Sequence, residues 1–459
     1  MSIEGLARHF GWEQRGVSAE FCGVSTDTRR LRPGELFVAL TGARFDGHDH
    51  VADAFGAGAA AAVVSRPLDV DGPQLIVPDT LRALGELAAL HRNAWPGVLL
   101  AITGSAGKTT TKEMLACMLG LKGEVNATAG NLNNEIGVPL TLLQLRPEHA
   151  YAVVEMGAAK PRDIEYLAAM ARPHVSILTN AMPAHLQGFG DLAQVAQTKG
   201  EIFGNSSDRV SVINLDDGFA SYWEQRAAGS AVLGFSAAGS AAAAVAARHT
   251  VLTPDGSEFQ LDTDQGRCRV CLQVPGAHNI ANALAAAAGG LAVGLSLDEV
   301  RRGLEQFDGV RGRLQRRTAA AGLLVIDDTY NANPAATLSA LEVLALQPGP
   351  RLFILGNMAE LGAEAEHHHR RVGVRARELG IEQLLAVGEF AAAAASGYGS
   401  EARSFASQFE LLEWLGREHV AARFRSCLVK GSRSARMENV VNYLVEAAPV
   451  SVGSGTGAN

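Results

Sequence analysis

The stretch AITGSAGKTTTKEM, residues 101–114, places a glycine-rich loop between two segments of different periodicity. Residues 98–102 form a continuous apolar run, which is typical of a strand buried on both faces. The apolar residues within 114–119 recur with helical spacing, so we expect a helix that begins near Gly107. The order of strand, glycine loop and helix predicts a phosphate-binding loop and therefore a nucleoside triphosphate as ligand.

The loop carries the residue types that a triphosphate needs. Gly104 and Gly107 let backbone N–H groups approach phosphate oxygens closely, and the helix N-terminus adds partial positive charge. Lys108 is placed to reach the β and γ phosphates, and Thr109 to hold Mg²⁺. Ile102 stands where the common pattern has its first glycine, so this is a shorter variant, and a plain surface loop is the alternative. The predicted nucleotide contacts in the loop are Gly104, Ser105, Ala106, Gly107, Lys108, Thr109 and Thr110.

Length and charge restrict the class of protein. A chain of 459 residues provides about three domains at roughly 150 residues each. Its 40 basic and 48 acidic side chains give a net charge of −8, and no basic run is present that would follow a nucleic-acid backbone. The first residues lack an apolar leader segment, and glycines interrupt the apolar stretch 283–297. We therefore expect a soluble, cytoplasmic protein with no nucleic-acid partner and no membrane insertion.

Two short motifs suggest metal sites that their spacing does not favour. Cys268 and Cys271 form a C-x-x-C in an alternating, strand-like segment, and no second pair accompanies them. His367, His368 and His369 are consecutive, and adjacent side chains on a helix diverge by about 100°. We expect ordinary strand residues in the first case and a solvated helix face in the second.

The pattern of elements predicts an α/β protein of three domains. Residues 1–84 read as short strands and a helix in a small α/β unit, and an amphipathic helix over about 81–93 leads to a breaker at 95–97. Residues 85–313 alternate strands with helices, with buried runs at 151–157, 175–180 and 210–217. This alternation predicts a parallel, doubly wound sheet whose ligand lies at the carboxyl ends of the strands.

The third predicted domain covers residues 314–459. A Gly/Arg-rich stretch at 307–317 without apolar periodicity separates it from the central domain. Four buried runs follow, at 323–328, 351–356, 384–388 and 427–431, and they close on Gly, Asp or Lys. This repeat of strand and polar turn predicts a Rossmann-like sheet whose loops share one edge. The small, polar tail 451–459 is expected to be disordered.

Three side chains follow the central strands and are candidates for metal chemistry. Glu155 ends a strand that can neighbour the loop strand, which would place its carboxylate beside Thr109 at a magnesium site. His185 follows the next strand, and Lys199 lies on a helix where burial would depress its pKa and leave a reactive neutral amine. The alternatives are a solvated strand-end carboxylate, a loop histidine and an exposed lysine.

A second group is placed to bind the nucleoside. His278, Asn279 and Asn282 lie at a loop-to-helix entry, where their side chains can read a nucleobase edge or cap the helix. Asp328 can accept from ribose hydroxyls, and Tyr330 offers a stacking face, which favours an active-site rim over a plain turn. Arg313, at the second boundary, can carry charge to the triphosphate from a moving domain.

Six segments in order carry a family resemblance over nearly the whole chain: TGSAGKTTTKEM (103–114), NLNNEIGVPLTLL (131–143), HLQGFG (185–190), DDTYNANP (327–334), GNMAELG (356–362) and VKGSRSARME (429–438). The chain resembles the Mur ligases, the cytoplasmic ATP-dependent amide ligases of peptidoglycan precursor assembly, and among them the members that add D-alanyl-D-alanine. The resemblance implies ATP and Mg²⁺ as cofactors, and UDP-N-acetylmuramoyl-tripeptide and D-alanyl-D-alanine as substrates. It also implies γ-phosphoryl transfer to a carboxylate and attack of an amine on the acyl phosphate. A monomer suits such a three-domain clamp.

The resemblance also implies roles for individual residues. The catalytic residues would be Lys108, Lys199 and His185, and the metal ligands Thr109, Glu155, His185 and Lys199, the last as a carbamate. The adenosine and triphosphate contacts would include His278, Asn279, Asn282, Arg313, Asp328 and Tyr330. The first domain is similar to a UDP-binding domain, and the substrate contacts would be Ser25, Thr26, Asp27, Asp46, Gly47, His48, Asn133, Asn134, Asn333, Lys430 and Ser432.

The sequence departs from the family pattern at two places and leaves rival functions open. Gln187 replaces a frequent Glu and Asn357 a usual Asp, so neither is assigned a metal role. A folylpolyglutamate-synthetase-like ligase would share the phosphate loop but lacks an 80-residue domain before it. A nucleotide-dependent switch would need the loop and the magnesium site but no UDP-binding domain. Whether the tripeptide ends in meso-diaminopimelate or lysine is not encoded in the spacing.

Overall fold

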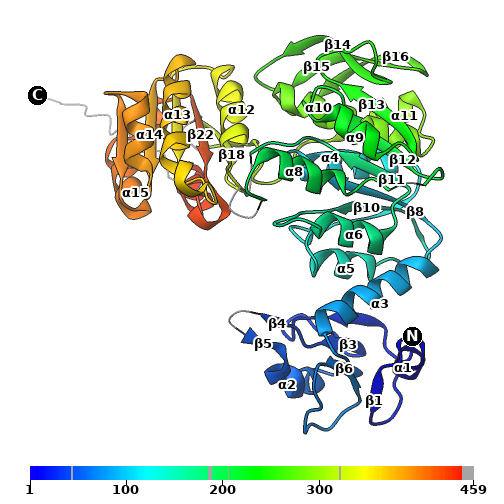
Figure 1. Ribbon diagram of the computed structural model, residues 1–459. Coiled ribbons are helices and arrows are strands. Elements are labelled where there is room, and N and C mark those ends of the chain that lie inside the picture. Colours follow the sequence, from blue (N-terminus) through cyan, green and yellow to red (C-terminus); the bar gives the residue numbers. More distant parts are fainter. Residues whose placement is uncertain (43–44, 184–188, 205, 320–321, 447–459) are drawn as a thin grey trace, which may run out of the picture.

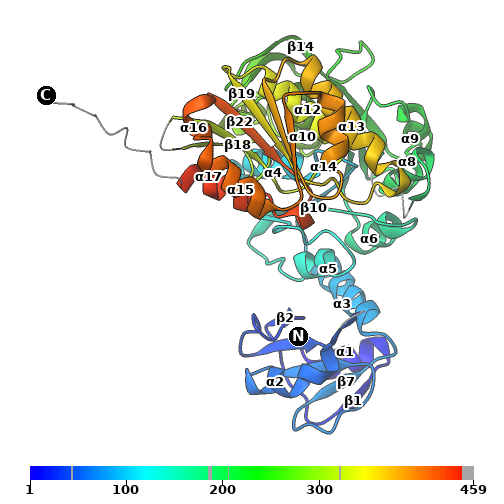
Figure 2. The ribbon, with the colours of Figure 1, turned by 90° about the vertical axis from the view of Figure 1, so that its left-hand side faces the viewer.

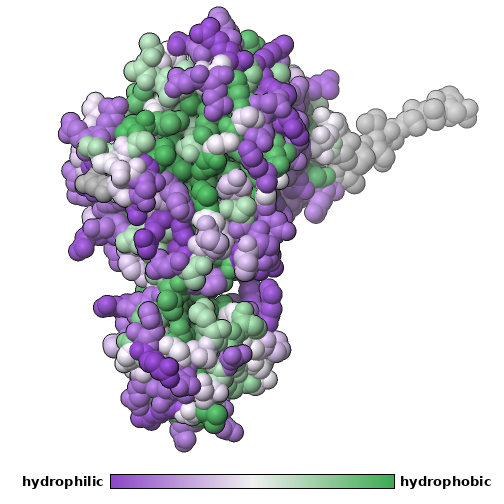
Figure 3. Space-filling view, turned by 90° about the vertical axis from the view of Figure 1, so that its right-hand side faces the viewer, coloured by the Kyte–Doolittle hydropathy of each residue, from purple (hydrophilic) through white to green (hydrophobic). Residues whose placement is uncertain are grey.

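The computed structural model describes residues 1–42, 45–183, 189–204, 206–319 and 322–446. They form three lobes that follow one another along the chain (Figure 1). The view in Figure 2 places the third lobe in front of the central lobe and the first lobe apart from both. The space-filling view narrows to a waist between the first and central lobes (Figure 3). The three-domain α/β prediction is confirmed, whereas the tail 451–459 lies outside the described residues.

The first lobe is a small α/β unit around a five-stranded sheet of order β1-β7-β6-β3-β2. Pairing is parallel from β2 to β7, and β1 is antiparallel to β7. The elements are α1 (Ile3–Phe10), β1 (Glu13–Arg15), β2 (Gly23–Ser25), β3 (Glu35–Val38), β4 (Thr41–Gly42), β5 (Phe45–Asp46), η1 (Gly47–His50), α2 (Val51–Gly56), β6 (Ala61–Val64) and β7 (Gln74–Ile76).

Helix α3 (Thr80–Ala94) connects the first and central lobes without a break. Leu84 and Leu87 belong to the core of the first lobe, whereas Ala88 belongs to a core of the central lobe. Asp79 caps the helix by accepting from the backbone N–H groups of Leu81 and Arg82. The predicted boundary at residue 84 therefore lies inside a helix that serves both lobes, and the exact division stays a prediction.

The central lobe is built on a nine-stranded sheet of order β16-β15-β14-β13-β12-β11-β8-β10-β9. The elements are β8 (Val98–Thr103), α4 (Lys108–Gly120), β9 (Glu124–Ala127), α5 (Gly137–Leu142), β10 (His149–Glu155), α6 (Asp163–Ala171), β11 (Val175–Leu178), α8 (Leu192–Gly200), β12 (Val210–Asn214), α9 (Ala220–Arg226), β13 (Ala231–Ser236), β14 (Val245–Leu252), β15 (Ser257–Thr263), β16 (Gly266–Leu272), α10 (Ala277–Ala292) and α11 (Leu297–Gln306).

Parallel pairing runs from β9 to β14, as predicted, but the sheet continues into an antiparallel extension that the sequence reading did not anticipate. There β14 pairs with β15 and β15 with β16 in antiparallel register. Cys268 and Cys271 lie on β16, as expected for ordinary strand residues. Because their separation of three places them on opposite faces of the strand, they cannot chelate one ion together.

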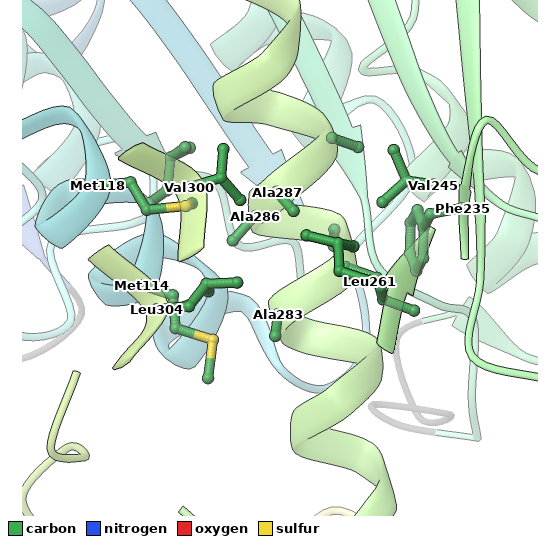
Figure 4. Close-up of a cluster of buried hydrophobic side chains, with 14 of the residues drawn as sticks. Met114, Met118, Phe235, Val245, Leu261, Ala283, Ala286, Ala287, Val300 and Leu304 are labelled. Atoms are coloured by element: carbon green, nitrogen blue, oxygen red, sulfur yellow. The ribbon is translucent and has the colours of Figure 1, made fainter. Parts of the chain in front are cut away.

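Helix α10 fills the centre of this lobe because one stretch of it is almost entirely alanine. Ala283, Ala286 and Ala287 are fully buried. Figure 4 shows them between Met114 and Met118 of α4 on one side and Phe235, Val245 and Leu261 of the sheet on the other. Small side chains let the helix approach both neighbours closely. This packing fixes α4, and with it the glycine loop.

The third lobe carries a six-stranded sheet of order β17-β18-β22-β19-β20-β21. The four predicted strands are parallel, β21 joins them, and β17, which the sequence reading missed, is antiparallel to β18. The elements are β17 (Gln315–Thr318), β18 (Leu324–Asp328), α12 (Pro334–Ala345), β19 (Arg351–Leu355), η2 (Gly362–Glu364), α13 (Ala365–Glu378), β20 (Gln383–Val387), α14 (Ala391–Tyr398), β21 (Ala402–Phe405), α15 (Gln408–Arg417), α16 (Val420–Arg423), β22 (Ser426–Lys430), η3 (Arg433–Ala435) and α17 (Glu438–Glu446).

The prediction of a solvated face for the three consecutive histidines is wrong for one of them. His367 is exposed, but His369 is 1% exposed. It follows Ala365 by one helical turn and precedes Val372, and both of these residues pack into the core of the third lobe. The helical spacing of these residues places His369 on the buried side of α13.

In the described ranges, no helix combines the length and the apolar character needed to cross a membrane. The apolar stretch 283–297 is divided between α10, which ends at Ala292, and α11, which begins at Leu297.

Candidate active site

The glycine loop between β8 and α4 has the conformation that the motif predicts. Gly104 has φ +149° and Gly107 has φ +82°, a region that side-chain-bearing residues rarely adopt. A Cβ atom on Gly104 would lie 2.0 Å from Thr179 Oγ1, and one on Gly107 would lie 2.1 Å from Asn282 Oδ1. Both positions therefore require glycine, because another residue would have an unfavourable φ angle and its Cβ atom would clash with a neighbouring side chain.

Asn180, which follows β11, holds the loop from the side. Its Oδ1 accepts the N–H of Ala106 at 2.9 Å, and its carbonyl accepts the N–H of Ser105 at 3.0 Å. The Ser105 hydroxyl donates to the Met182 carbonyl at 3.0 Å. Asn180 is the last residue of the run 175–180 that the sequence predicts as a buried strand. Its position next to the loop follows from the parallel pairing of β11 with β8.

Lys108 begins α4 and lies under the loop. Its Nζ donates to the Gly104 carbonyl at 2.8 Å. Burial lowers the pKa of the amine, the nearby Glu155 carboxylate raises it, and Arg313 lowers it further. A partly buried amine beside a phosphate-binding loop is suited to meet phosphate oxygens, because their negative charge compensates the cost of burying its positive charge.

The structure brings Thr109 and Glu155 together, as the strand-end argument predicted. Strand β10 pairs with β8 so that Glu155 lies opposite Ile102, directly before the loop. The Thr109 hydroxyl donates to Glu155 Oε2 at 2.7 Å, and Asn133 Nδ2 donates to Oε1 at 2.8 Å. Both carboxylate oxygens and one hydroxyl thus meet beside the phosphate loop. Hard oxygen donors of this kind match the preference of Mg²⁺.

Lys199, on α8, is buried, whereas an ordinary lysine on a surface helix is exposed. The residue is 3% exposed, and its Nζ lies 5.7 Å from the centre of the Phe189 ring. Burial, assisted by the positive charge of Lys108, lowers the pKa of the amine from 10.5 to about 7, although Asp163 and Glu201 raise it. A large fraction of the amine is therefore neutral near pH 7. His185 and Gln187 lie outside the described residues.

Two cavities meet at the phosphate loop. The small one, about 350 Å³, has the size of an ordinary ligand pocket and is lined by the loop, the start of α10 and the segment after β18. The large one, about 1210 Å³, extends between the central and third lobes and is lined by Glu155, Lys199 and Ser432 among others. Both are lined by Ser105, Lys108, Thr109, Arg313, Tyr330, Asn331 and Asn333. Lys108 and Thr109 therefore lie between the two cavities and line both.

The three residues at the start of α10 line the small cavity, and the helix-capping alternative is wrong for all of them. The N-cap of α10 is Gly276, and no side chain caps this helix. Asn279 Nδ2 donates to the Pro275 carbonyl at 2.8 Å, and Asn282 Nδ2 donates to Asn279 Oδ1 at 3.1 Å. His278 is partly buried, and its burial lowers its pKa. A neutral imidazole and two amides therefore face the small cavity.

Arg313 links the two lobes at the site. Its Nη2 donates to the Thr109 hydroxyl at 2.9 Å, and its guanidinium lies 4.3 Å from the centre of the Tyr330 ring. Its Nε is buried without a hydrogen-bond partner among the described residues. The predicted stacking face of Tyr330 is thus occupied by a cation that also contacts the phosphate loop.

The third-lobe candidates follow β18 and β22, which are neighbours. Lys430 Nζ donates to Asp328 Oδ2 at 2.5 Å and to the Asn331 carbonyl at 3.0 Å. Asn333 caps α12 by accepting the N–H of Ala336 at 2.8 Å. Ser432 lines the large cavity, and so do Asn133 and Asn134 from the central lobe.

The candidates of the first lobe lie away from both cavities. Neither lining includes Ser25, Thr26, Asp27, Asp46, Gly47 or His48. Asp46 Oδ1 lies 2.5 Å from His48 Nδ1, and His48 Nε2 accepts the backbone N–H of Ser65 at 2.8 Å. Although the Ser65 hydroxyl also lies 3.0 Å from Nε2, the amide already occupies that lone pair. The arrangement anchors a loop and does not activate a nucleophile.

Sequence reasoning missed Lys112, which is buried four residues after Lys108 on α4. Its Nζ donates to the Thr128 carbonyl at 2.6 Å and pairs with Glu113 Oε1 at 2.6 Å. The Thr128 hydroxyl in turn accepts the N–H of Glu155 at 2.9 Å. Helical spacing from Lys108 is the signal that would have found Lys112.

Asn357, which was given no metal role, points away from the site, since its Oδ1 accepts the N–H of Phe390 at 3.3 Å.

Comparison with known proteins accounts for all three lobes. The Mur ligase middle domain matches residues 102–290, the Mur ligase glutamate ligase domain matches 312–433, and the Mur ligase family catalytic domain matches 20–92. The UDP-N-acetylmuramoyl-tripeptide–D-alanyl-D-alanine ligase of Escherichia coli K12 is 46% identical over 437 residues, which cover 95% of this chain and 96% of that one. The chain belongs to the Mur ligase family.

Two solved structures extend the likeness of this Mur ligase to its fold. A crystal structure of MurF from Acinetobacter baumannii shares 36% identity and a TM-score of 0.90, covering 97% of this chain and 98% of that one. MurF from Thermotoga maritima in complex with ADP shares 26% identity and a TM-score of 0.79, covering 92% and 97%. As a Mur ligase the chain is an ATP-dependent ligase. The switch hypothesis is therefore wrong, and the match at 20–92 counts against the folylpolyglutamate-synthetase-like hypothesis.

Proposed function

We propose that this Mur ligase joins D-alanyl-D-alanine to UDP-N-acetylmuramoyl-tripeptide with ATP, giving the pentapeptide conjugate, ADP and phosphate. The observation that carries the proposal is that a cavity of about 350 Å³ and a larger one of about 1210 Å³ share Lys108 and Thr109 as lining residues. A γ-phosphate bound beside these two residues would face an acceptor in the large cavity. The identity to ligases of this name over 95% of the chain supports the choice of substrates.

We assign the nucleotide to the small cavity. Residues 104–110 would contact the triphosphate, and His278, Asn279 and Asn282 the adenosine. Asp328, on the third-lobe side, would accept from ribose hydroxyls, which would tie this lobe to the bound nucleotide. Arg313 would move its charge from the Thr109 hydroxyl toward the phosphates. Because ATP is the cosubstrate, we propose that the enzyme acts in the cytoplasm.

The donors beside the loop fit Mg²⁺. The Thr109 hydroxyl and the Glu155 carboxylate are hard oxygen donors that already meet at 2.7 Å. Within the described ranges, no three His, Cys, Asp or Glu side chains gather into a metal cluster, so the oxygens of ATP would complete the coordination. When bound, the ion would neutralise phosphate charge. A carbamate on Lys199 and the imidazole of His185 would serve a second ion.

Formation of that carbamate requires a neutral amine. Lys199 Nζ would attack carbon dioxide, forming a C–N bond and releasing one proton. The depressed pKa of about 7 makes the neutral form available at physiological pH. Burial also protects the carbamate from the solvent protons that would reverse the reaction.

The first chemical step is phosphoryl transfer to the tripeptide. A carboxylate oxygen attacks the γ-phosphorus, the bond to the bridging oxygen of ADP breaks, and an acyl phosphate forms. Lys108 and Arg313, which line both cavities, would lie where negative charge develops on the transferring group. Fixed positive charges there require no reorganisation during the reaction, which lowers the barrier.

The second step forms the amide. The amine of D-alanyl-D-alanine attacks the acyl carbon, the C–O bond to phosphate breaks, and the amine proton is released. We place the dipeptide at the third-lobe wall of the large cavity with Asn333 and Ser432, next to Lys430 on the side that lines the small cavity, and the tripeptide beside Asn133 and Asn134. The first lobe, with Ser25, Thr26, Asp27 and residues 46–48, would receive the UDP moiety. Closure of the lobes would exclude water from the acyl phosphate.

The test is mass spectrometry of the products from the purified enzyme with ATP, Mg²⁺ and UDP-N-acetylmuramoyl-tripeptide, with and without D-alanyl-D-alanine. Tripeptides that end in lysine and in meso-diaminopimelate are both supplied. We expect a pentapeptide conjugate only with the dipeptide, matched by an equal amount of ADP. Consumption of ATP without this conjugate would overturn the choice of acceptor.

A further inference from the structure

One buried histidine has no part in the reaction described above. His369 is 1% exposed and lies on α13, a helix of the third lobe that is labelled in Figure 1. Its ring lies 4.9 Å from that of Phe390, which precedes α14. A fully enclosed polar ring is unfavourable unless its nitrogens find partners, so their bonds indicate what the residue does.

Both ring nitrogens have partners of opposite kind. Nε2 accepts the backbone N–H of Met358 at 3.0 Å. Nδ1 lies 2.7 Å from the Ala365 carbonyl, which can only accept, so Nδ1 carries the proton. Burial lowers the pKa of the ring, consistent with a neutral imidazole of this tautomer. His369 thus uses its one lone pair to hold the amide of a loop that follows β19.

That loop forms part of the wall of the large cavity. Ala359, Glu360 and Leu361 line the cavity together with Ser432. The start of the loop is fixed by the Gly356 N–H, which donates to the Lys430 carbonyl at 2.8 Å, and by the Asn357 carbonyl, which accepts the N–H of Ser432 at 2.9 Å. The bond from Met358 to His369 is the next one along the chain, immediately before the lining residues.

The loop has a conformation that needs such support. Glu360 has φ +62°, in the left-handed region that non-glycine residues rarely adopt. The Thr337 hydroxyl contacts Met358 Sδ at 3.5 Å, but this is a weak interaction. A strained turn persists only where surrounding contacts determine it. The hydrogen bond to His369 Nε2 supplies a directional contact at Met358, the residue directly before the cavity-lining residues 359–361.

We propose that His369 is a positioning residue that holds the 358–361 loop in the shape required to bind the incoming amine substrate. The proposal rests on the assignment of the third-lobe wall to D-alanyl-D-alanine. Loss of the bond from Met358 lets the wall relax, which weakens the binding of the dipeptide. ATP and the tripeptide bind to other walls and are unaffected.

Two amide variants test the two hydrogen bonds of the His369 ring one at a time. The side-chain amide of His369→Gln reaches the place of Nε2 and can accept from Met358, whereas that of His369→Asn reaches only the place of Nδ1 and can donate to Ala365. His367→Ala, two residues away on the exposed side of the same helix, is the control. Circular dichroism and thermal unfolding establish which full-length variants are folded.

The readout is KM for each of the three substrates in the complete reaction. For His369→Asn we expect KM for D-alanyl-D-alanine to rise about tenfold, with KM for ATP and tripeptide within about twofold of the parent enzyme. His369→Gln should return KM for the dipeptide to within about threefold, and His367→Ala should match the parent. The expected pattern requires both amide variants to be compared as folded proteins.

Equal KM values for the dipeptide in the two amide variants would overturn the proposal, because a merely structural role depends equally on both bonds. A parallel rise in KM for ATP would overturn it as well. If one amide variant does not fold, hydrogen exchange of the 356–361 amides in the other decides: protection retained in Gln or lost in Asn supports the proposal, and the reverse overturns it. Failure of the parent enzyme to use the dipeptide would instead contradict the proposed function.

Discussion

Two amines line the same large cavity and have different chemical environments: Lys108 is partly buried and Lys199 is buried. Lys108 donates to the carbonyl of Gly104, and the carboxylate of Glu155 partly offsets the cost of its burial. Lys199 faces the ring of Phe189, and the positive charge of Lys108 disfavours its protonation. The first amine is thereby suited to bind anions, and the second to react as a neutral nucleophile.

Replacement of Lys108 by alanine should abolish product formation while the protein stays folded. The variant removes the positive charge that would meet the β and γ phosphates, and loss of one such electrostatic contact costs about 100-fold or more in rate. Stability should not fall, because the pKa of this amine is lowered in the folded protein and its charge therefore opposes folding. Product formation and thermal unfolding are measured together. Near-normal turnover in a folded variant would remove the phosphate-loop assignment.

Lys199 makes stability depend on pH in a defined window. Its pKa is about 7 in the folded protein and 10.5 as an ordinary lysine, so between these values the unfolded state binds more protons. The free energy of unfolding should therefore rise with pH from about pH 7 to about pH 10.5. Below about pH 7 the amine is charged in both the folded and the unfolded state, so it does not make the free energy of unfolding depend on pH.

The variant Lys199→Met isolates this contribution. We expect the parent protein to gain stability relative to the variant by up to about 1.4 kcal/mol per pH unit within the window. Urea unfolding of both proteins at several pH values, in buffer depleted of carbon dioxide so that no carbamate forms, measures the difference. Parallel stability curves for the two proteins would show that the amine is not buried as described.

Among the elements, α3 carries the connection between the first and central lobes. Arg92, near its C-terminus, is 7% exposed and donates from Nε to the Ala171 carbonyl at 2.9 Å, where α6 ends. Its two other nitrogens donate to the carbonyls of Trp95 and Arg172, both at 3.2 Å. One guanidinium thus satisfies carbonyls at the ends of two helices, which fixes α3 to α6.

Arg92→Ala should destabilise the protein by about 2 to 4 kcal/mol, because it leaves several carbonyls at the helix ends without a donor. Arg82→Ala is the matched control on the same helix. Its side chain is 76% exposed and, among the residues that the structure describes, its guanidinium pairs with Glu86, so its removal should cost less than about 1 kcal/mol. Urea unfolding compares the two. A smaller loss for Arg92 than for Arg82 would contradict the capping role.

The sequence predicts elements well where one periodicity is strong. The strand before the phosphate loop, α4 and the four central strands of the third lobe agree with their predicted positions, because continuous apolar runs and helical spacing are local signals. Strands β15 and β16 were not placed in the sheet, because antiparallel pairing with β14 depends on neighbours outside the local pattern. β17 carries the sequence QRRT and has no apolar alternation at all.

The site, like the fold, was predictable where strand order and strand ends decide a position, and not where long-range packing decides it. Glu155 was found because strand order and strand ends place it beside Thr109. The burial of Lys199 and the bond from Asn133 to Glu155 were not, because they depend on how α8 and the 131–135 loop pack against the sheet. The side chains of Asp46 and His48 bond to each other, and His48 also accepts the N–H of Ser65; only the fold reveals these bonds.

At the scale of the whole molecule, the third lobe is joined to the central lobe by a short linker with unusual backbone angles. Gly309 has φ +111°, Gly312 has φ +70° and Leu314 has φ +51°. Beside the linker, Arg316 Nη1 and Gln347 Nε2 both donate to the Pro254 carbonyl, at 2.6 and 2.8 Å. These bonds attach the third lobe to the turn between β14 and β15. A rotation of the third lobe about the linker must either break these two hydrogen bonds or move the turn between β14 and β15 along with the lobe.

Arg316→Ala combined with Gln347→Ala should therefore widen the range of lobe orientations. The ion pair from Arg316 to Asp255 contributes little, because Asp255 is 83% exposed, so the two bonds to the Pro254 carbonyl are the relevant restraint. Small-angle X-ray scattering of the ligand-free protein should show a broader distribution of interatomic distances in the double variant than in the parent. Arg317→Ala is the control, because Arg317 bonds to Asn442 within the third lobe. Scattering curves that coincide for the parent and the double variant would show that the linker and the phosphate-loop contact of Arg313 alone set the orientation.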